Sequence, residues 1–282
     1  MHNLTSNHWK KWVNSSAMAT MIFSIVMLLV LPTQLPDAVQ SAAFTPLLAL
    51  EWVRSVEEFK RLMGASESSG DLLMQLHRGN YIDYLFMCSY ALFLTCVNFF
   101  LQATAKEKKQ TRSIFLSQGG FILLVSLPLI AFACDAFENV ILLSLSHHAL
   151  PFYQKMPIDV SMLTTESFHQ STPFSMELLS FLVRIKFIAF AVYLLMVAWA
   201  GQKSLGSVGR ALQISSIVNA IVWMTAFFIP KPMLDVGSFS IALSLIFLWV
   251  GVRYEGKFKK RIDAEATTKD IAASRLGSRK AI

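Results

Sequence analysis

The sequence lacks the motifs of the common catalytic classes. It contains no Gly-x-Ser-x-Gly, no HExxH, no Walker A and no GxGxxG pattern, so nothing in it indicates a serine hydrolase, a zinc protease, a nucleotidase or a dinucleotide enzyme. The only cysteines are Cys88, Cys96 and Cys134, and all three fall in apolar stretches. This placement argues against a disulfide framework and against a thiolate metal site.

Charged residues are scarce as well, at 15% of 282 residues, whereas 54% of the chain is hydrophobic and the mean hydropathy is +0.50. This composition excludes an ordinary soluble domain. The chain is expected to be an all-α membrane protein with one transmembrane domain over residues 1–254 and a basic, polar tail over residues 255–282. Spans of about 20 residues are predicted at 13–32, 82–103, 115–145, 178–200, 211–229 and 237–253.

The distribution of lysine and arginine predicts the orientation, because basic residues that flank spans stay in the cytoplasm. Most of the 25 basic residues lie at the two termini and in the loops after the second and fourth spans. Both termini are therefore predicted to be cytoplasmic, and the net charge of +7 reflects this orientation rather than nucleic-acid binding. The Asn-x-Ser/Thr matches at Asn3 and Asn14 lie on the cytoplasmic side, which favours a bacterial inner membrane.

The first apolar run, after Lys10 and Lys11, has the charged start of a signal peptide. Pro32, Pro36 and the later spans favour a retained first helix instead. An amphipathic helix is predicted in the outer loop 33–80, with Gly64 as its stop. Its apolar residues are Leu47, Leu50, Val53, Phe59 and Leu62, and Glu51 lies among its charged residues. The helix forms either a lid on the membrane surface or a helix packed on the bundle with a solvated charged face.

Three polar residues interrupt the third span. Because successive residues are about 100° apart on a helix, Asp135, Glu138 and Asn139 share one face. An ionisable group near the centre of a span costs at least roughly 2.5–3.5 kcal/mol, so such groups usually face protein or water. This face is the candidate site.

Further polar residues lie in the neighbouring spans. Asp83, Tyr90 and Asn98 share a stripe of the second span, Lys186 and Tyr193 share a stripe of the fourth, and Asn219 lies in the fifth. Arg184 is about 200° from Lys186 around its helix, so it is assigned to an interface or snorkelling position. Lys186 is predicted to form an ion pair with Asp135 or Glu138. Pro128 leaves the Leu124 carbonyl without its helical donor, which predicts a kink.

Four segments resemble a group of uncharacterised bacterial multi-pass inner-membrane proteins. They are Ala-Leu-Glu-Trp-Val-Arg at 49–54, Tyr-Ile-Asp-Tyr-Leu-Phe at 81–86, Asp-Ala-Phe-Glu-Asn-Val at 135–140 and Arg-Ile-Lys-Phe at 184–187. The Asp-x-x-Glu-Asn segment at the end of the third span is the most specific of them. The resemblance implies a topology and a site position, and no activity.

Three functions are compatible with these residues. The first is binding or transport of a small polar molecule, an ion or a lipid headgroup at an acidic outer-leaflet pocket. The second is a scaffold whose charges assemble the bundle or a partner membrane protein. The third, which the missing motifs disfavour, is an enzyme acting on a lipid-linked substrate with Asp135 or Glu138 as general acid or base.

No cofactor or metal is predicted, and the lipid bilayer is the one expected partner besides a small ligand or another membrane protein. No histidine falls within a predicted span, which removes the usual axial ligand of a haem. A metal site would have to draw on histidines of the outer ends, namely His77, His147, His148 and His169.

Overall fold

The computed structural model describes residues 5–31, 50, 51, 53, 55–64, 68–107, 117–154, 159–172, 174–201, 206–228 and 230–255. Within these residues every regular element is a helix. The helices are α1 (Ser6–Val30), α3 (Val56–Met63), α4 (Ser69–Glu107), α5 (Gln118–Tyr153), α6 (Thr165–Ser171), α7 (Met176–Gly201), α8 (Gly206–Phe228) and α9 (Pro230–Arg253). The predicted all-α class is confirmed for this part of the chain, whereas nearly all of the tail 255–282 lies outside it.

Four helices, α1, α4, α5 and α7, are long and apolar enough to cross a membrane. The other two predicted spans, 211–229 and 237–253, coincide with α8 and α9, but neither helix meets the same criteria over its described residues. The count of six spans therefore stays a prediction.

The two central helices are longer than predicted. With 39 residues in α4 and 36 in α5, they reach about 58 Å and 54 Å at 1.5 Å per residue, well beyond a hydrocarbon core of about 30 Å. The third span was predicted to end at residue 145, and this end is wrong, because α5 continues to Tyr153. Buried Ala149 and Tyr153 keep the extra turns packed, and the helix ends two residues after Pro151.

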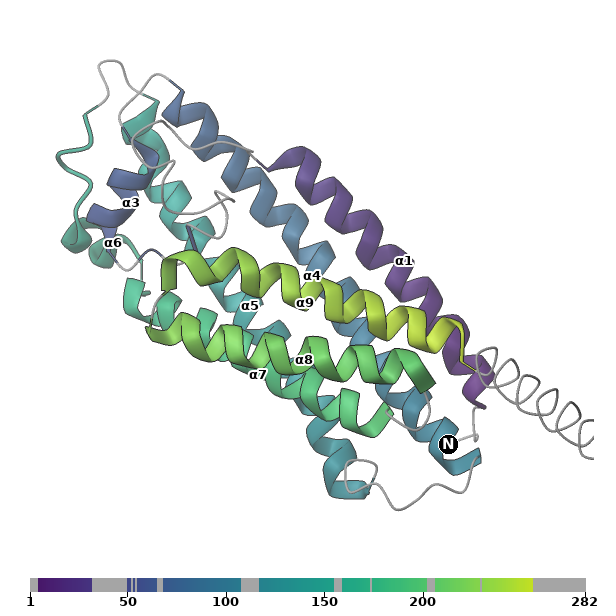
Figure 1. The fold of residues 1–282 in the computed structure, drawn as a ribbon. Helices are drawn as coiled ribbons and strands as arrows, with labels where there is room; N and C mark the ends of the chain where they lie inside the picture. Colours follow the sequence, from purple (N-terminus) through teal and green to yellow (C-terminus); the bar gives the residue numbers. More distant parts are fainter. Residues whose placement is uncertain are drawn as a thin grey trace, which may run out of the picture.

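The short helices α3 and α6 lie together at one end of the bundle (Figure 1). Lys60 Nζ donates to the Leu163 carbonyl at 2.8 Å, and the Thr165 hydroxyl donates to Glu57 Oε2 at 3.1 Å. We call α3, α6 and residues 50, 51 and 53 the cap, and this end of the bundle the capped end.

Local sequence explains where the cap helices begin and end. The Ser55 hydroxyl accepts from the Glu58 amide at the start of α3, and Gly64 stops the helix at φ 66°, a backbone conformation that favours glycine. The longer amphipathic helix predicted from residue 47 is not confirmed, because Ser55 is extended and residues 47–49, 52 and 54 lie outside the described chain. Helix α6 was not predicted. Thr164 and Ser167 form a capping box at its start, a pattern that could have indicated it.

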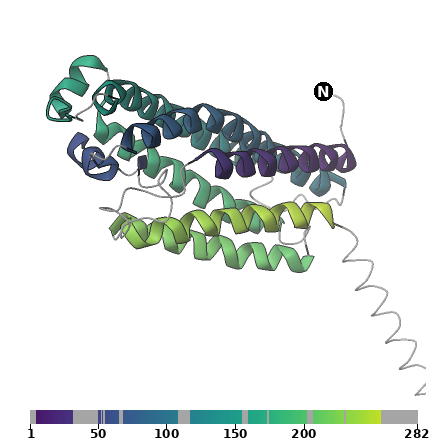
Figure 2. The same ribbon diagram turned by 90° about the horizontal axis from the view of Figure 1, so that it is seen from above.

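The long helices pack side by side in the order α1, α4, α5, α7, α8 and α9, and α9 returns to α1. Figures 1 and 2 show α1 beside α4, and α8 with α9 on another side of the bundle. Trp249 Nε1 of α9 donates to Asn14 Oδ1 of α1 at 3.1 Å. Lys10 Nζ lies 3.4 Å from the Glu255 carbonyl. The start of α1 and the end of α9 therefore lie together at the end of the bundle opposite the cap, which we call the tail end.

Candidate functional site

Lys186 of α7 is the centre of a buried ionic cluster. Its Nζ donates to Asp135 Oδ1 at 2.9 Å and to Glu51 Oε2 at 3.3 Å. Glu138 Oε2 lies 2.7 Å from the same nitrogen, as an ion pair without the geometry of a hydrogen bond. We call these four residues the Lys186 cluster. The predicted ion pair is present with both acids of α5, and the cap adds a third.

Helix geometry explains why these side chains meet. Asp135 and Glu138 are three residues apart on α5, so they project from one face toward α7. Lys186 projects from α7 toward that face and is only 5% exposed. Arg184 stays half-buried two residues away, on another side of the helix. Its assignment to an interface or snorkelling position stays a prediction.

Helix α4 completes the surroundings of the cluster with two further contacts. The Tyr90 hydroxyl donates to Asp135 Oδ2 at 2.7 Å, so both oxygens of Asp135 are engaged. Asn139 Nδ2 donates to Asp83 Oδ2 at 2.6 Å. Asp83 thus lies beside the cluster and takes the Asn139 amide as its partner, and the polar stripe predicted on α4 does face α5.

The cluster holds more acidic groups than basic ones. Three carboxyls surround one ammonium, which leaves a net charge of −2 if all four groups are ionised. The four residues are at most 8% exposed, and unpaired charge is costly in such surroundings. Glu138 Oε1 is buried and has no hydrogen-bond partner among the described residues. A bound proton or another small cation would therefore reduce the net negative charge of the cluster.

Glu51 is the residue that the sequence prediction misplaced. It was assigned to the charged face of an amphipathic helix, but it is 8% exposed and enters the bundle from the cap. Burial raises the pKa of the Glu51 carboxyl above its ordinary value of 4.5, and the Lys186 ammonium counteracts part of this rise. The one available signal was that Glu51 stands alone among apolar neighbours, at Ala-Leu-Glu-Trp-Val.

A second buried polar contact lies nearer the tail end. Asn98 Nδ2 donates to the Leu124 carbonyl at 2.8 Å, which is the carbonyl that Pro128 deprives of its helical donor. The Tyr193 hydroxyl contacts Asn98 Oδ1 at 3.1 Å and the Leu94 carbonyl at 3.0 Å. Asn98 and Tyr193 therefore compensate for the proline and join three helices, at a distance from the ionic cluster along α4.

Asn219, the last predicted supporting residue, is separate from both groups. The Ser240 hydroxyl of α9 donates to Asn219 Oδ1 of α8 at 3.2 Å, and the Ser244 hydroxyl contacts Ser215 Oγ at 3.0 Å. These bonds tie α8 to α9. Asn219 thus has a packing role.

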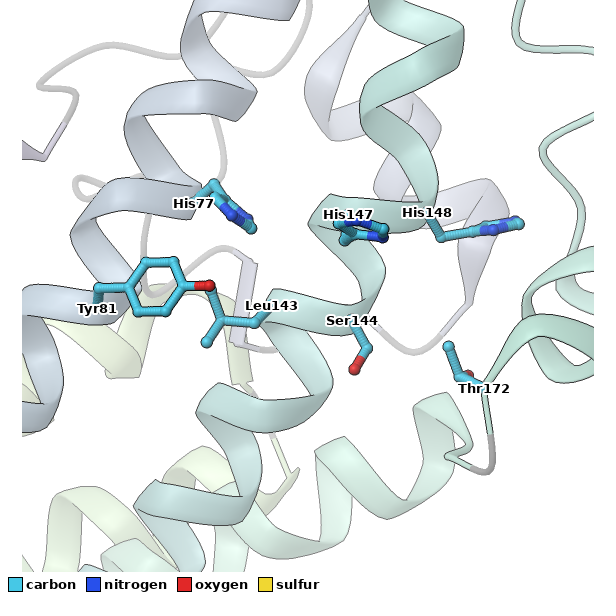
Figure 3. Close-up of a pocket in the computed structure, with 7 residues that line it drawn as sticks. All are labelled: His77, Tyr81, Leu143, Ser144, His147, His148 and Thr172. Atoms are coloured by element: carbon cyan, nitrogen blue, oxygen red, sulfur yellow. The ribbon is translucent and has the colours of Figure 1, made fainter.

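A pocket of about 340 Å³ lies between α4 and α5 at the capped end. Its lining residues are His77, Tyr81, Leu143, Ser144, His147, His148 and Thr172. Figure 3 shows His77 and Tyr81 directed from α4 toward α5. Within the described residues, no group of three His, Cys, Asp or Glu side chains is placed to hold a metal ion.

Comparison with protein-family models, with curated proteins and with solved structures finds no match. The protein is therefore interpreted from its own geometry. It is a helical bundle of membrane type that contains a capped, acid-rich ionic cluster.

Proposed function

We propose that the chain is a six-span protein of a bacterial inner membrane that binds a proton or small monovalent cation at the Lys186 cluster. The observation that carries the proposal is the convergence of three buried carboxyls on one ammonium, with Glu138 Oε1 left without a hydrogen-bond partner among the described residues. Because these side chains already touch one another, the geometry favours a compact ion over a larger polar molecule.

The proposed topology has both termini in the cytoplasm and the capped end outside. Its support is the predicted distribution of basic residues together with the meeting of the start of α1 and the end of α9, as an even number of crossings requires. Reporter fusions after residue 65 and after residue 160 test it. A cytoplasmic signal from both fusions would contradict the orientation.

Ion binding is tested by the stability of the purified, detergent-solubilised chain. Glu138→Gln imitates one bound proton at that carboxyl, so the variant should gain less stability on acidification than the wild type does. For a metal cation, sodium or potassium chloride should instead stabilise the wild type at pH 8, with choline chloride as the control salt, and Glu138→Gln should abolish the effect. Stability that responds to neither pH nor cation in the wild type would refute the proposal.

A scaffold role is the second candidate, because the cluster joins the cap to α4, α5 and α7 through Glu51, Tyr90, Asp135 and Lys186. Buried polar groups can specify how helices are arranged. In a pure scaffold, Glu138→Gln should lower stability by a similar amount at every pH and in every salt. The same titration thus separates the two candidates.

A further inference from the structure

The pocket between α4 and α5 differs chemically from the ionic cluster. Six of its seven described lining residues carry N–H or O–H groups, and no carboxylate is among them. The hydroxyls of Ser144 and Thr172 already donate to the carbonyls of Val140 and Phe168. Such a lining suits an anion with several acceptor oxygens, and it holds no carboxylate that would favour a cation among its described residues. His77 Nδ1 is buried and has no hydrogen-bond partner among the described residues, and Figure 3 shows the His77 ring directed toward His147.

An apolar strip leads from the pocket toward the tail end. Leu85 lies four residues after Tyr81, and Val140 and Phe137 lie four and seven residues before Ser144, so each continues the helix stripe of a pocket residue. These three side chains are exposed, at 52% for Leu85, 38% for Val140 and 58% for Phe137. Both helices are long and apolar enough to cross a membrane, so the strip suits a hydrocarbon chain.

The apolar strip and the polar pocket match the acyl chain and the headgroup of a lipid. Seven residues of helix separate Phe137 from Ser144, about 10 Å at 1.5 Å per residue, which is a spacing suited to the upper acyl chain and the headgroup of a lipid. Tyr81 is 58% exposed at the pocket's edge, and tyrosine is enriched at the headgroup level of membranes.

We propose that the pocket between α4 and α5 binds the phosphate of a phospholipid through His77, His147 and Tyr81, with one acyl chain lying along Leu85, Val140 and Phe137. The site is separate from the Lys186 cluster, and it does not depend on ion binding there. Its occupant is a membrane lipid taken from the surrounding leaflet.

The test uses the full-length protein in detergent, titrated with phosphatidylglycerol and followed by native mass spectrometry. The paired variant His77→Leu/His147→Leu should bind this lipid at least about tenfold more weakly, because hydrogen bonds to the charged phosphate are lost. His8→Leu, on α1 at the tail end, is the matched control and should bind as the wild type does. His147 is exposed, so His147→Leu alone serves if the pair does not fold.

Two further arms identify the ligand. Diacylglycerol with the same chains, which lacks the phosphate, should bind at least about tenfold more weakly than phosphatidylglycerol, and millimolar inorganic phosphate should not displace the lipid. Phe137→Asn should weaken lipid binding, whereas Ile22→Asn on the exposed face of α1 should not. Equal binding of diacylglycerol, full competition by free phosphate, or equal retention by the wild type and all the variants would overturn the proposal.

Discussion

Replacing Lys186 by methionine tests the ionic cluster most directly. The substitution keeps an unbranched apolar stem and removes the ammonium that lies within 3.3 Å of Glu51, Asp135 and Glu138. Three buried carboxyls are then left without their cation. Removing one partner of a buried ion pair typically costs about 3–5 kcal/mol, so Lys186→Met should lower the free energy of unfolding by at least about 3 kcal/mol.

Arg184→Met is the matched control, because it removes a cation two residues away that lies outside the cluster. Its cost should be about 1 kcal/mol or less, the range of an ion pair at the edge of a protein. Combining Lys186→Met with Glu138→Gln should recover part of the loss, since one of the stranded acids is neutralised. Unfolding in mixed detergent micelles is measured for five purified proteins, which are the wild type, Lys186→Met, Arg184→Met, Glu138→Gln and the combined variant.

Two results would refute this reasoning. Equal losses in Lys186→Met and Arg184→Met would show that burial in the cluster adds nothing. Strict additivity in the combined variant would show that Lys186 and Glu138 do not interact, although 2.7 Å separates Nζ from Oε2.

Three smaller perturbations examine the surroundings of the cluster by the same unfolding measurement. Tyr90→Phe removes a hydroxyl that donates to Asp135 and should cost about 1.5–3 kcal/mol, the value of a hydrogen bond to a charged group; an unchanged stability would contradict that bond. Asn98→Leu leaves the buried Leu124 carbonyl unpaired and should cost about 1–3 kcal/mol, and a neutral effect would mean that the carbonyl freed by Pro128 needs no donor. The pKa of Glu51 is raised in the folded chain, so its contribution to folding stability is present at low pH and is lost as the pH rises above 4.5 through the folded value. Glu51→Gln should therefore gain stability relative to the wild type between pH 5 and pH 9. Parallel plots of stability against pH for the two proteins would contradict this prediction.

Much of the cluster could be predicted because it follows from helix periodicity. The spacing of Asp135 and Glu138 places both on one face of α5, and the depth of Lys186 in its own helix brings it to the same level. The sequence also indicated that Pro128 frees the Leu124 carbonyl. It did not indicate which donor would satisfy that carbonyl, because Asn98 reaches it from a different helix.

Glu51 and the pocket could not be predicted in this way, since each depends on contacts between distant segments. Glu51 is 135 residues from Lys186 in sequence, and the charged residues that follow it, Arg54, Glu57 and Glu58, give the whole segment the charge pattern of a solvated helix face. His147 was assigned to a loop, yet the extension of α5 places it opposite His77 of α4 (Figure 3). The periodicity of a sequence describes one helix at a time. It carries no information on how far a helix continues when a neighbouring helix packs against it.

Glu51 is the acid of the Lys186 cluster that comes from the cap, so an opening of the cap would change the charge of the cluster. With the cap in place, Lys186 contacts three carboxyls; with residues 50 and 51 withdrawn, it would keep the two acids of α5. Each added negative charge makes the cluster a better acceptor for a proton or cation, so cap closure should strengthen ion binding. By linkage, ion binding must then favour the closed cap by the same free energy. An ion that entered from the capped end would thus hold its own entrance closed, and its release would require either opening of the cap or a change in the charge on Lys186.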